Sequence, residues 1–381
     1  MEINIGFFVR HFTERGTEVA IYDYAKYNEE ILGNKSYIIC FTEKKQKELN
    51  MPLTRISFPK FKNRFEVIEI DDICDMKELI NKKKLTHFYT LTHGGEDIYD
   101  FNNKDIWNKC KTIKHCVFNT KTQESDCYIG ISDYLNKYHN TNIQVVPHII
   151  HFPTNSIDNL RKKLNIPENA IVLGRHGGNT TFDIEYVHEC IKEIINYRED
   201  IYFLFLNTDK FYEHKQIIYL EKTTDENEKQ KFINTCDAMI HARSEGETFG
   251  AAVAEFSISN KPVITCNCGD LEHIKILKNK GIIYNNKEEL NRIFHNIENI
   301  IKSRSDWNAY REYTPEKVMK IFKEICLDYN EFDFTYEKYK EYFRIHFKNN
   351  NMDVLTNKEL WVNYNTHDKL NEKINYFLFH Q

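Results

Sequence analysis

The chain has 381 residues, of which 41% are hydrophobic and 29% charged, and its formal net charge is -5. This composition is that of a globular protein long enough for two domains, and it excludes global disorder. The slightly acidic balance gives no reason to expect a nucleic-acid partner. Apolar runs stay well short of the roughly 20 residues of a membrane-spanning helix, so we expect no transmembrane segment.

The N-terminal stretch MEINIGFFVRHF predicts a first β-strand rather than a signal peptide, and we therefore expect a cytoplasmic protein. The ten cysteines are scattered without a Cys-x-x-Cys pair, which is typical of reduced thiols. Cys266 and Cys268 are one closely spaced pair, and His148 and His151 are another. Neither pair supplies the ligand count of a zinc site, so we expect no metal and no bound cofactor.

Short apolar runs alternate with amphipathic ones through the first part of the chain. A helix is predicted over 17–32, where TEVAIYDYAKYNEEIL follows the first strand. Continuous apolar strands separated by helices indicate a parallel sheet buried on both faces. The strands predicted there cover 3–9, 36–41, 65–70, 87–92, 115–119, 127–131 and 143–146.

The same alternation begins again after a stretch that contains three of the seven prolines, PHIIHFPTNSIDNLRKKLNIPEN. The predicted strands of this second series cover 170–175, 201–206, 216–220, 237–242, 262–266 and 281–284. Residues 286–328 are expected to be helices that complete the second domain. The chain therefore divides into a first α/β domain (1–150), a linker (151–169), a second α/β domain (170–328) and a helical extension of unassigned role (329–381).

The segment SEGETFGAAVAEFS, residues 244–257, joins a predicted loop to a predominantly apolar helix. The loop follows the 237–242 strand, at the edge where open α/β sheets bind their ligands. The backbone N–H groups of Phe249, Gly250 and Ala251 are expected to be free at the helix start, where the helix dipole favours an anion such as phosphate.

Two carboxylates accompany this loop and helix. Glu247 and Glu255 are eight residues apart, roughly 12 Å along a helix, so they cannot share a proton. Glu255 lies among alanines and other apolar residues, where an unpaired buried carboxylate would be costly. A pair of ligand hydroxyls, as on a ribose, would satisfy it; an exposed position or a pair with a nearby lysine is the alternative.

A second loop begins the second domain, in AIVLGRHGGNTTFD. The strand is predicted to end at Gly174, with Arg175 at its carboxyl end and Gly177 and Gly178 opening the backbone. Because this loop and the 244–251 loop emerge at the same sheet edge, Arg175 is expected to meet the bound anion. An arginine that only caps the strand end is the alternative. The chain contains no GxxxxGK[ST] loop, so nucleotide hydrolysis driven by such a loop is not expected.

The stretch from Glu247 to Gly250, with Glu255 eight residues after Glu247 and Lys-Pro-Val-Ile at 261–264, resembles the Glu-x7-Glu signature of retaining glycosyltransferases with the GT-B fold, most closely the family-4 group. The Gly174-Arg175 loop is similar to that group's phosphate loop, and residues 15–18 are similar to its acceptor-side entrance. The resemblance covers roughly residues 3 to 325. It implies an α/β protein with the GT-B architecture, in which two doubly wound Rossmann-like domains face each other across a cleft.

The resemblance implies a hexosyltransferase that moves a sugar from a nucleotide-diphosphate donor to an acceptor hydroxyl, with retention and without metal. Glu247 would contact the transferred sugar, Glu255 the ribose, and Arg175 the leaving diphosphate. The family's lysine after that arginine is missing here, with Arg243 and Lys222 as possible substitutes. His115 matches the family's cleft histidine in place, with a structural histidine as the alternative. The residues implied for the donor are Glu255, Thr248, Phe249, Gly250, Ala251, Gly177, Gly178 and Arg243, and those for the acceptor side are Gly16 and Thr17.

Base recognition is expected near LEKTTDE, residues 220–226, and near residues 207–213. The acceptor class, whether glycan, lipid or protein, stays open. Three alternative functions remain: a GT-B-shaped binding protein without turnover, a phosphorylase or epimerase of the same fold, and an NAD-dependent oxidoreductase. The oxidoreductase would require G-x-G-x-x-G after the first strand, and IGFFVRHFTERGTEVA lacks that spacing.

Overall fold

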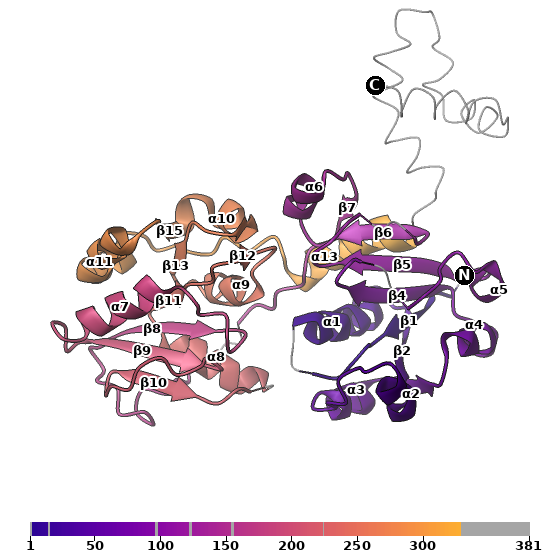
Figure 1. Cartoon of the computed structure of the whole chain (residues 1–381), viewed down its shortest axis with the longest axis horizontal. Coiled ribbons are helices and arrows are strands. Elements are labelled where there is room, and N and C mark those ends of the chain that lie inside the picture. Colours follow the sequence, from indigo (N-terminus) through magenta and orange to yellow (C-terminus); the bar gives the residue numbers. More distant parts are fainter. Residues whose placement is uncertain are drawn as a thin grey trace, which may run out of the picture. The chain divides into compact units, whose positions relative to one another are not determined.

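The computed structural model describes residues 2–13, 16–95, 98–121, 124–153, 156–223 and 225–328. Two separate parallel β-sheets, one formed within residues 4–145 and the other within 171–284, organise the chain (Figure 1). The predicted extension, 329–381, lies outside the described residues. None of the helices in the described ranges is long and apolar enough to cross a membrane.

The first sheet contains β1 (Asn4–Phe8), β2 (Lys35–Phe41), β3 (Glu66–Ile70), β4 (His87–Thr92), β5 (Lys111–Cys116), β6 (Cys127–Gly130) and β7 (Gln144–Val145). Its strand order is β3-β2-β1-β4-β5-β6-β7, and every pairing is parallel. All residues of β1 and β4 are buried, as expected for central strands covered on both faces. Its helices are α1 (Gly16–Glu30), α2 (Glu43–Glu48), α3 (Phe58–Arg64), α4 (Met76–Lys83), α5 (Lys104–Trp107), α6 (Asp133–His139) and the 3-10 helix η1 (Ile73–Asp75).

The fifth strand corrects a prediction. The sequence placed it at 115–119, whereas β5 ends at Cys116, where it pairs with the last residue of β4, Thr92. The pairing between β4 and β5 ends at these two residues. The backbone N–H groups of Phe118 and Asn119 both donate to the carbonyl of His93, at 3.1 and 2.9 Å, so these residues form a turn.

The second sheet contains β8 (Ile171–His176), β9 (Ile201–Leu206), β10 (Ile217–Leu220), β11 (Ala238–His241), β13 (Val263–Cys266) and β15 (Gly281–Tyr284). Its order is β10-β9-β8-β11-β13-β15, which repeats the 3-2-1-4-5-6 order of the first sheet. Such doubly wound sheets bind ligands where the strand order reverses. Here that point lies between β8 and β11.

Helices and one small additional sheet complete the second domain. The additional sheet pairs two short parallel strands, β12 (Gly246–Glu247) and β14 (Asp270–Leu271). The helices are α7 (Glu185–Ile194), α8 (Glu226–Thr235), α9 (Ala251–Ile258), α10 (Glu272–Leu277), α11 (Lys287–His295), α12 (Ile297–Lys302) and the 3-10 helix η2 (Lys278–Lys280). The large core of this domain joins α7 and α11 to β9 and β11. It fixes the sheet edge from which the site loops emerge.

One close approach inside this core depends on a glycine. Gly174 lies within β8, and a Cβ atom there would come 2.2 Å from Sγ of Cys236 and 3.2 Å from the ring of Phe256. Cys236 follows α8, and Phe256 belongs to α9. The absence of a side chain at Gly174 therefore lets both segments pack directly onto the central strand.

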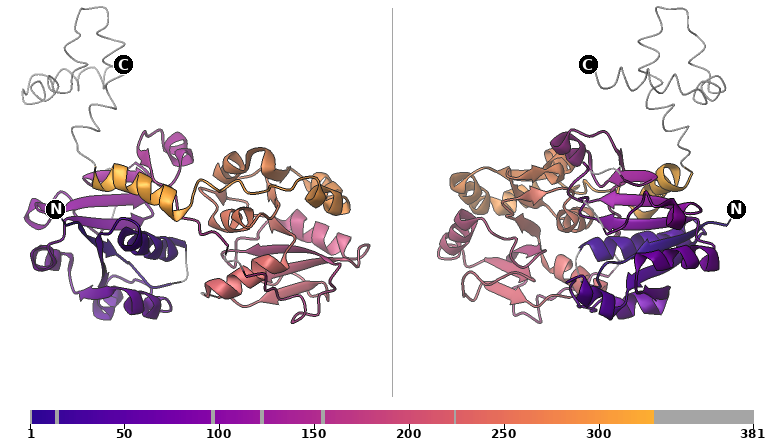
Figure 2. Two further views of the ribbon diagram at one scale, coloured as in Figure 1. Left: turned by 180° about the vertical axis from the view of Figure 1, so that it is seen from behind. Right: turned by 45° about the vertical axis from the view of Figure 1, so that its right-hand side comes forward.

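The chain then returns to the first domain. Helix α13 (Pro315–Phe322) packs against α1, and the ring centroids of Phe322 and Tyr24 are 5.2 Å apart. The left view of Figure 2 shows α13, in orange-yellow, beside the first sheet. This helix, predicted to complete the second domain, thus contributes to the first. A short π-helix, η3 (Lys323–Leu327), follows it in the chain.

Candidate functional site

The site is built around the segment between β11 and α9. The predicted loop 244–250 contains the short strand β12, whose pairing with β14 fixes the backbone of Glu247. Gly246 and Gly250 have positive φ values of 66° and 80°, a region that suits glycine. A Cβ atom on Gly246 would lie 2.2 Å from the carbonyl oxygen of Asp270, so β14 can approach only a glycine here.

Glu247 is held by two nitrogen-containing side chains. Its Oε1 lies 3.2 Å from Nε2 of His241, and its Oε2 accepts a hydrogen bond from Arg243 at 3.2 Å. One fifth of the side chain is exposed. Burial opposes ionisation of Glu247, but the hydrogen bond from His241 and the positive charge of Arg243 outweigh it, so its pKa lies below the ordinary value. The carboxylate is ionised and partly open to a ligand.

A buried hydrogen-bonded chain extends from Glu247 into the sheet. Nδ1 of His241 lies 2.8 Å from the hydroxyl of Thr265, which lies 2.9 Å from Nε2 of His273. Burial, together with the proximity of His241, lowers the pKa of His273 to about 3. A neutral His273 can donate to Thr265, Thr265 to His241, and His241 to Glu247. Neither histidine could be singled out from the sequence, because they lie on β11 and α10 and come together only in the fold, through Thr265 of β13 and through their rings, whose centroids are 5.0 Å apart.

Glu255 faces α8 and the end of β8. Nζ of Lys229 donates to its Oε1 at 2.5 Å, and Nε2 of His176 lies 2.9 Å from its Oε2, though without hydrogen-bond alignment. The ion pair between Glu255 and a nearby lysine, which the sequence left as an alternative, is therefore present in this structure. Burial opposes ionisation of Glu255, yet the charge of Lys229 and the proximity of His176 hold its pKa well below the ordinary value. Its side chain is one quarter exposed, although Oε2 itself is buried.

Arg175 is buried within β8, which ends at His176, two residues later than predicted. Its guanidinium donates to the hydroxyls of Thr208 and Thr181, each at 2.6 Å, and to the carbonyls of Gly178 and Asn207 at 2.7 and 3.3 Å. Burial lowers the pKa of Arg175 to about 10. The residue thus holds two loops together and places a positive charge beneath them. A Cβ on Gly177 would lie 3.1 Å from its terminal nitrogen.

The start of α9 lies between Glu247 and Glu255 in the chain. Ala251 is exposed at this start, while Thr248 and Phe249 are buried. The hydroxyl of Tyr310 donates to the carbonyl of Phe249 at 2.9 Å. This bond restrains the backbone next to Gly250. The first N–H groups of α9 have no preceding helical turn whose carbonyls they could bond.

The two proposed substitutes for the missing lysine lie differently. Arg243 bridges Glu245, at 2.8 Å, and Glu247. Lys222 is exposed in the segment after β10. Lys229 of α8, which could not be singled out from the sequence, donates to Glu255. Burial alone would lower the pKa of Lys229. Glu255 and other nearby carboxylates raise it by more than burial lowers it, so the side chain is charged.

The predicted residues of the first domain have partners within that domain. His115 is fully buried, with Nδ1 2.7 Å from the hydroxyl of Tyr89, and burial lowers its pKa to about 3. The role of His115, catalytic or structural, stays a prediction. Gly16 and Thr17 begin α1, where the Thr17 hydroxyl donates to the buried carboxylate of Glu18 at 2.9 Å. Arg15 lies outside the described residues.

One member of each closely spaced pair, Cys266 with Cys268 and His148 with His151, contacts a side chain outside its pair. Sγ of Cys266 lies 3.6 Å from the Tyr186 hydroxyl, and Nε2 of His151 lies 3.0 Å from Asp23. In the described ranges, no three His, Cys, Asp or Glu side chains are grouped as metal ligands would be.

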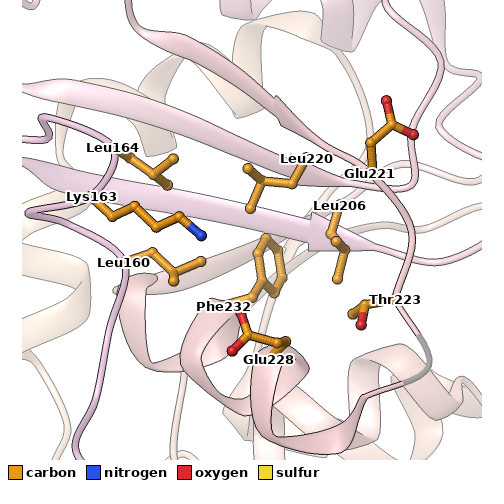
Figure 3. A pocket seen from close by; sticks show the side chains of 9 residues that line it. All are labelled: Leu160, Lys163, Leu164, Leu206, Leu220, Glu221, Thr223, Glu228 and Phe232. Atoms are coloured by element: carbon orange, nitrogen blue, oxygen red, sulfur yellow. The ribbon is translucent and has the colours of Figure 1, made fainter.

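Two pockets border this region. The first, of about 240 Å³, lies beside α8 and the ends of β9 and β10 (Figure 3). Its apolar lining consists of Leu160, Leu164, Leu206, Leu220 and Phe232, and its polar lining of Lys163, Glu221, Thr223 and Glu228.

The second pocket, of about 480 Å³, joins residues of both sequence halves. From the first half it is lined by His93, Phe118, Tyr134, Leu135 and Tyr138. From the second half it is lined by Arg243, Glu245, Gly246, Thr248 and Asp270, which surround Glu247 in the chain.

Comparisons with known proteins identify the fold. No family model and no curated protein sequence matches the chain. Solved structures do: a glycosyltransferase from Rickettsia africae ESF-5 (17% identity, TM-score 0.61, 86% of this chain and 100% of that one) and Anabaena Alr3699/HepE in complex with UDP-glucose (13%, TM-score 0.65, 85% and 98%). WaaG, a glycosyltransferase of lipopolysaccharide biosynthesis, also matches (12%, TM-score 0.59, 85% and 100%). The chain therefore has the GT-B fold, with two Rossmann-like α/β domains.

Proposed function

We propose that this GT-B protein is a glycosyltransferase that moves a hexosyl group from a nucleotide-diphosphate sugar to an acceptor hydroxyl, with retention and without a metal ion. The observation that carries the proposal is the arrangement of Glu247 and Glu255. Both are ionised, both are partly exposed, and they flank the start of α9 at the ligand-binding edge of the sheet. The family-4-like Glu-x7-Glu signature assigns them to the transferred sugar and the ribose.

Glu255 suits a ribose because its two oxygens can accept from two neighbouring hydroxyls. In the structure these oxygens face Lys229 and His176. A ribose that donates to Glu255 would compete with Lys229 for the carboxylate. The released ammonium would then be available to the diphosphate, in place of the lysine missing from residues 177–183.

The leaving diphosphate would be stabilised by fixed positive groups. The start of α9 would offer the N–H groups of Phe249, Gly250 and Ala251 and the positive end of its dipole. Arg175 lies beneath the loop that contains Gly177 and Gly178 and adds a full charge. Preorganised donors of this kind lower the barrier because they need no reorganisation as negative charge develops on the leaving group. This cationic set is the basis for proposing a metal-independent reaction.

The donor proposed first is a UDP-sugar, because the Anabaena neighbour was crystallised with UDP-glucose. The pocket of Figure 3 supports a place for the base: it adjoins residues 220–223, where base recognition was predicted, and it is lined by α8, the helix that contains Lys229. The leucine side chains and Phe232 offer apolar contact, and Glu221 and Glu228 offer acceptors for base N–H groups. The cytoplasmic location stays a prediction.

The test is release of nucleoside diphosphate and of a glycoside from UDP-glucose, GDP-mannose, ADP-glucose and dTDP-glucose, with and without EDTA. Glu247→Ala should lower turnover by about a hundred-fold or more, as expected when a transition-state contact is removed. Glu189→Ala, which changes an exposed glutamate of α7 in the same domain, is the matched control and should match the wild type. The anomeric configuration of the product, read by NMR, tests retention. Undiminished turnover in Glu247→Ala would contradict the site assignment.

A further inference from the structure

The pocket lined by residues of both sequence halves, next to Glu247, combines aromatic and acidic side chains. We propose that it binds the acceptor as a neutral carbohydrate ring, and that Phe118 and Tyr138 are its stacking surfaces. This inference rests on the proposed function, because a donor must bind first at Glu247 and Glu255. It goes further by assigning the class of acceptor.

Two exposed aromatic side chains mark the pocket. Phe118 is 43% exposed and Tyr138 69% exposed, although large aromatic rings are usually buried. Each is supported by a second ring: His93 lies 5.3 Å from Phe118, and Tyr134 is stacked on Tyr138 with centroids 6.1 Å apart. Aromatic faces exposed together at a concave site favour a ligand with a flat apolar face. The C–H face of a pyranose ring has that shape.

The residues that line this pocket from the second half of the sequence are mostly polar, and two of them are acidic. Asp270 interacts with the hydroxyl of Tyr134 and thereby raises the pKa of Tyr134 to about 12. Glu245 is three quarters exposed, so its carboxylate is open to solvent. Carboxylate oxygens are acceptors only, and they suit the hydroxyl donors of a sugar.

The charges of this lining disfavour an anionic acceptor. Arg243 is the only guanidinium or ammonium group among the ten described lining residues, and it is already shared between Glu245 and Glu247. A phosphorylated acceptor would approach Glu245 and Asp270 without a free cation to balance it. A neutral sugar meets no such repulsion.

The position of the pocket is the one that transfer requires. Gly246 and Thr248, which line it, are the chain neighbours of Glu247. Arg243, which also lines it, donates to Oε2 of Glu247 at 3.2 Å, so an acceptor hydroxyl bound there would lie close to the sugar that Glu247 is proposed to hold. Proximity of this kind converts a bimolecular reaction into an effectively unimolecular one.

The experiment is saturation-transfer NMR on the full chain in the presence of UDP. The probes are the methyl glycosides of glucose, galactose, mannose and N-acetylglucosamine, alongside the corresponding free sugar 6-phosphates. We expect ring-proton signals from at least one neutral glycoside and none from the phosphates. Phe118→Ala and Tyr138→Ala should each weaken binding of that glycoside by about 5- to 10-fold, the loss typical of one aromatic contact. Tyr197→Ala, which removes an aromatic ring 80% exposed in the second domain, is the matched control and should leave binding unchanged.

The outcomes separate the two claims. Thermal unfolding of the same samples reports whether UDP binds. If UDP stabilises the protein and signals come only from sugar phosphates, from no probe, or equally from wild type and both variants, the acceptor assignment is overturned while the proposed function stands. If none of UDP, GDP, ADP and dTDP stabilises the protein, the proposed function fails, and the acceptor assignment fails with it.

Discussion

The two Rossmann-like domains repeat one strand order, yet the residues predicted for the site have different partners in each. In the first, the fully buried His115 has a neutral tyrosine hydroxyl as its partner. In the second, each of two partly buried carboxylates faces two nitrogen groups, His241 and Arg243 for Glu247, and Lys229 and His176 for Glu255. Both domains have the same scaffold, so the chemistry of the site comes from residues at and beyond the strand ends of the second one.

The largest expected difference concerns the central strands. A Cβ on Gly174 of β8 meets the short, fully buried side chain of Cys236 at 2.2 Å, whereas on Gly6 of β1 it meets the flexible end of Ile39 at 2.5 Å. Gly174→Ala should therefore lower the free energy of unfolding by about 3 kcal/mol and Gly6→Ala by about 1 kcal/mol. Urea unfolding of the two variants measures both values. Equal losses would show that the second domain is no more tightly constrained than the first.

A smaller effect is expected from the ion pairs. Lys229→Ala leaves Glu255 with His176 as its one close nitrogen partner and should cost about 2 kcal/mol, because a largely buried carboxylate loses a charged hydrogen-bond donor. The control is Lys83→Ala in the first domain, which breaks the pair between Lys83 and the exposed Glu66. Its loss should be much smaller, since solvent screens that pair. The comparison fails if the two variants unfold at the same urea concentration.

The smallest effect is a pH dependence shared by both domains. His115 and His273 have pKa values of about 3 in the folded chain, against an ordinary value near 6.5 when unfolded. Below pH 6.5 the unfolded chain binds these protons and the folded chain does not, so stability is present above pH 6.5 and is lost as pH falls. At pH 5.5 each histidine should remove about 1.4 kcal/mol.

Glutamine substitution at each histidine, measured by urea unfolding at pH 7.5 and 5.5, tests that pH dependence. Both variants should show a weaker pH dependence than the wild type. His273→Gln should also lower sugar transfer, because it interrupts the chain through Thr265 to Glu247. His115→Gln should affect stability alone. A pH dependence equal to that of the wild type in both variants would contradict the assignment.

Much of the fold followed from the sequence because the central strands are uninterrupted apolar runs. The strands at 87–92, 201–206 and 281–284 coincide with β4, β9 and β15. The fold class, two Rossmann-like domains in the GT-B architecture, is confirmed. The pairing of β12 with β14 escaped prediction, because two residues have no periodicity to detect. The packing of α13 on α1 also escaped it, since apolar helix faces do not specify their partner.

The candidate site was predictable only in part. Glu247, Glu255 and Arg175 were visible from the sequence, in a loop, within a helix and at a strand end, and their functional roles stay predictions. His176, Lys229 and His241 were not visible, because each contacts Glu247 or Glu255 from another element, and His273 was not visible because it connects to Glu247 only through Thr265 and His241. Sequence spacing reports neighbours on one helix or strand, whereas these contacts depend on the order of strands in the sheet.

The central claim, that Glu255 helps to bind a nucleoside diphosphate, is tested most directly by thermal unfolding with UDP, GDP, ADP and dTDP, without added metal. The wild type is compared with Glu255→Ala, each relative to its own ligand-free transition. A ligand at 100 times its dissociation constant should stabilise the wild type by about 2.7 kcal/mol. We expect this stabilisation with one nucleotide and little or none in the variant. Equal stabilisation of both proteins, or none of either at millimolar nucleotide, would contradict the account.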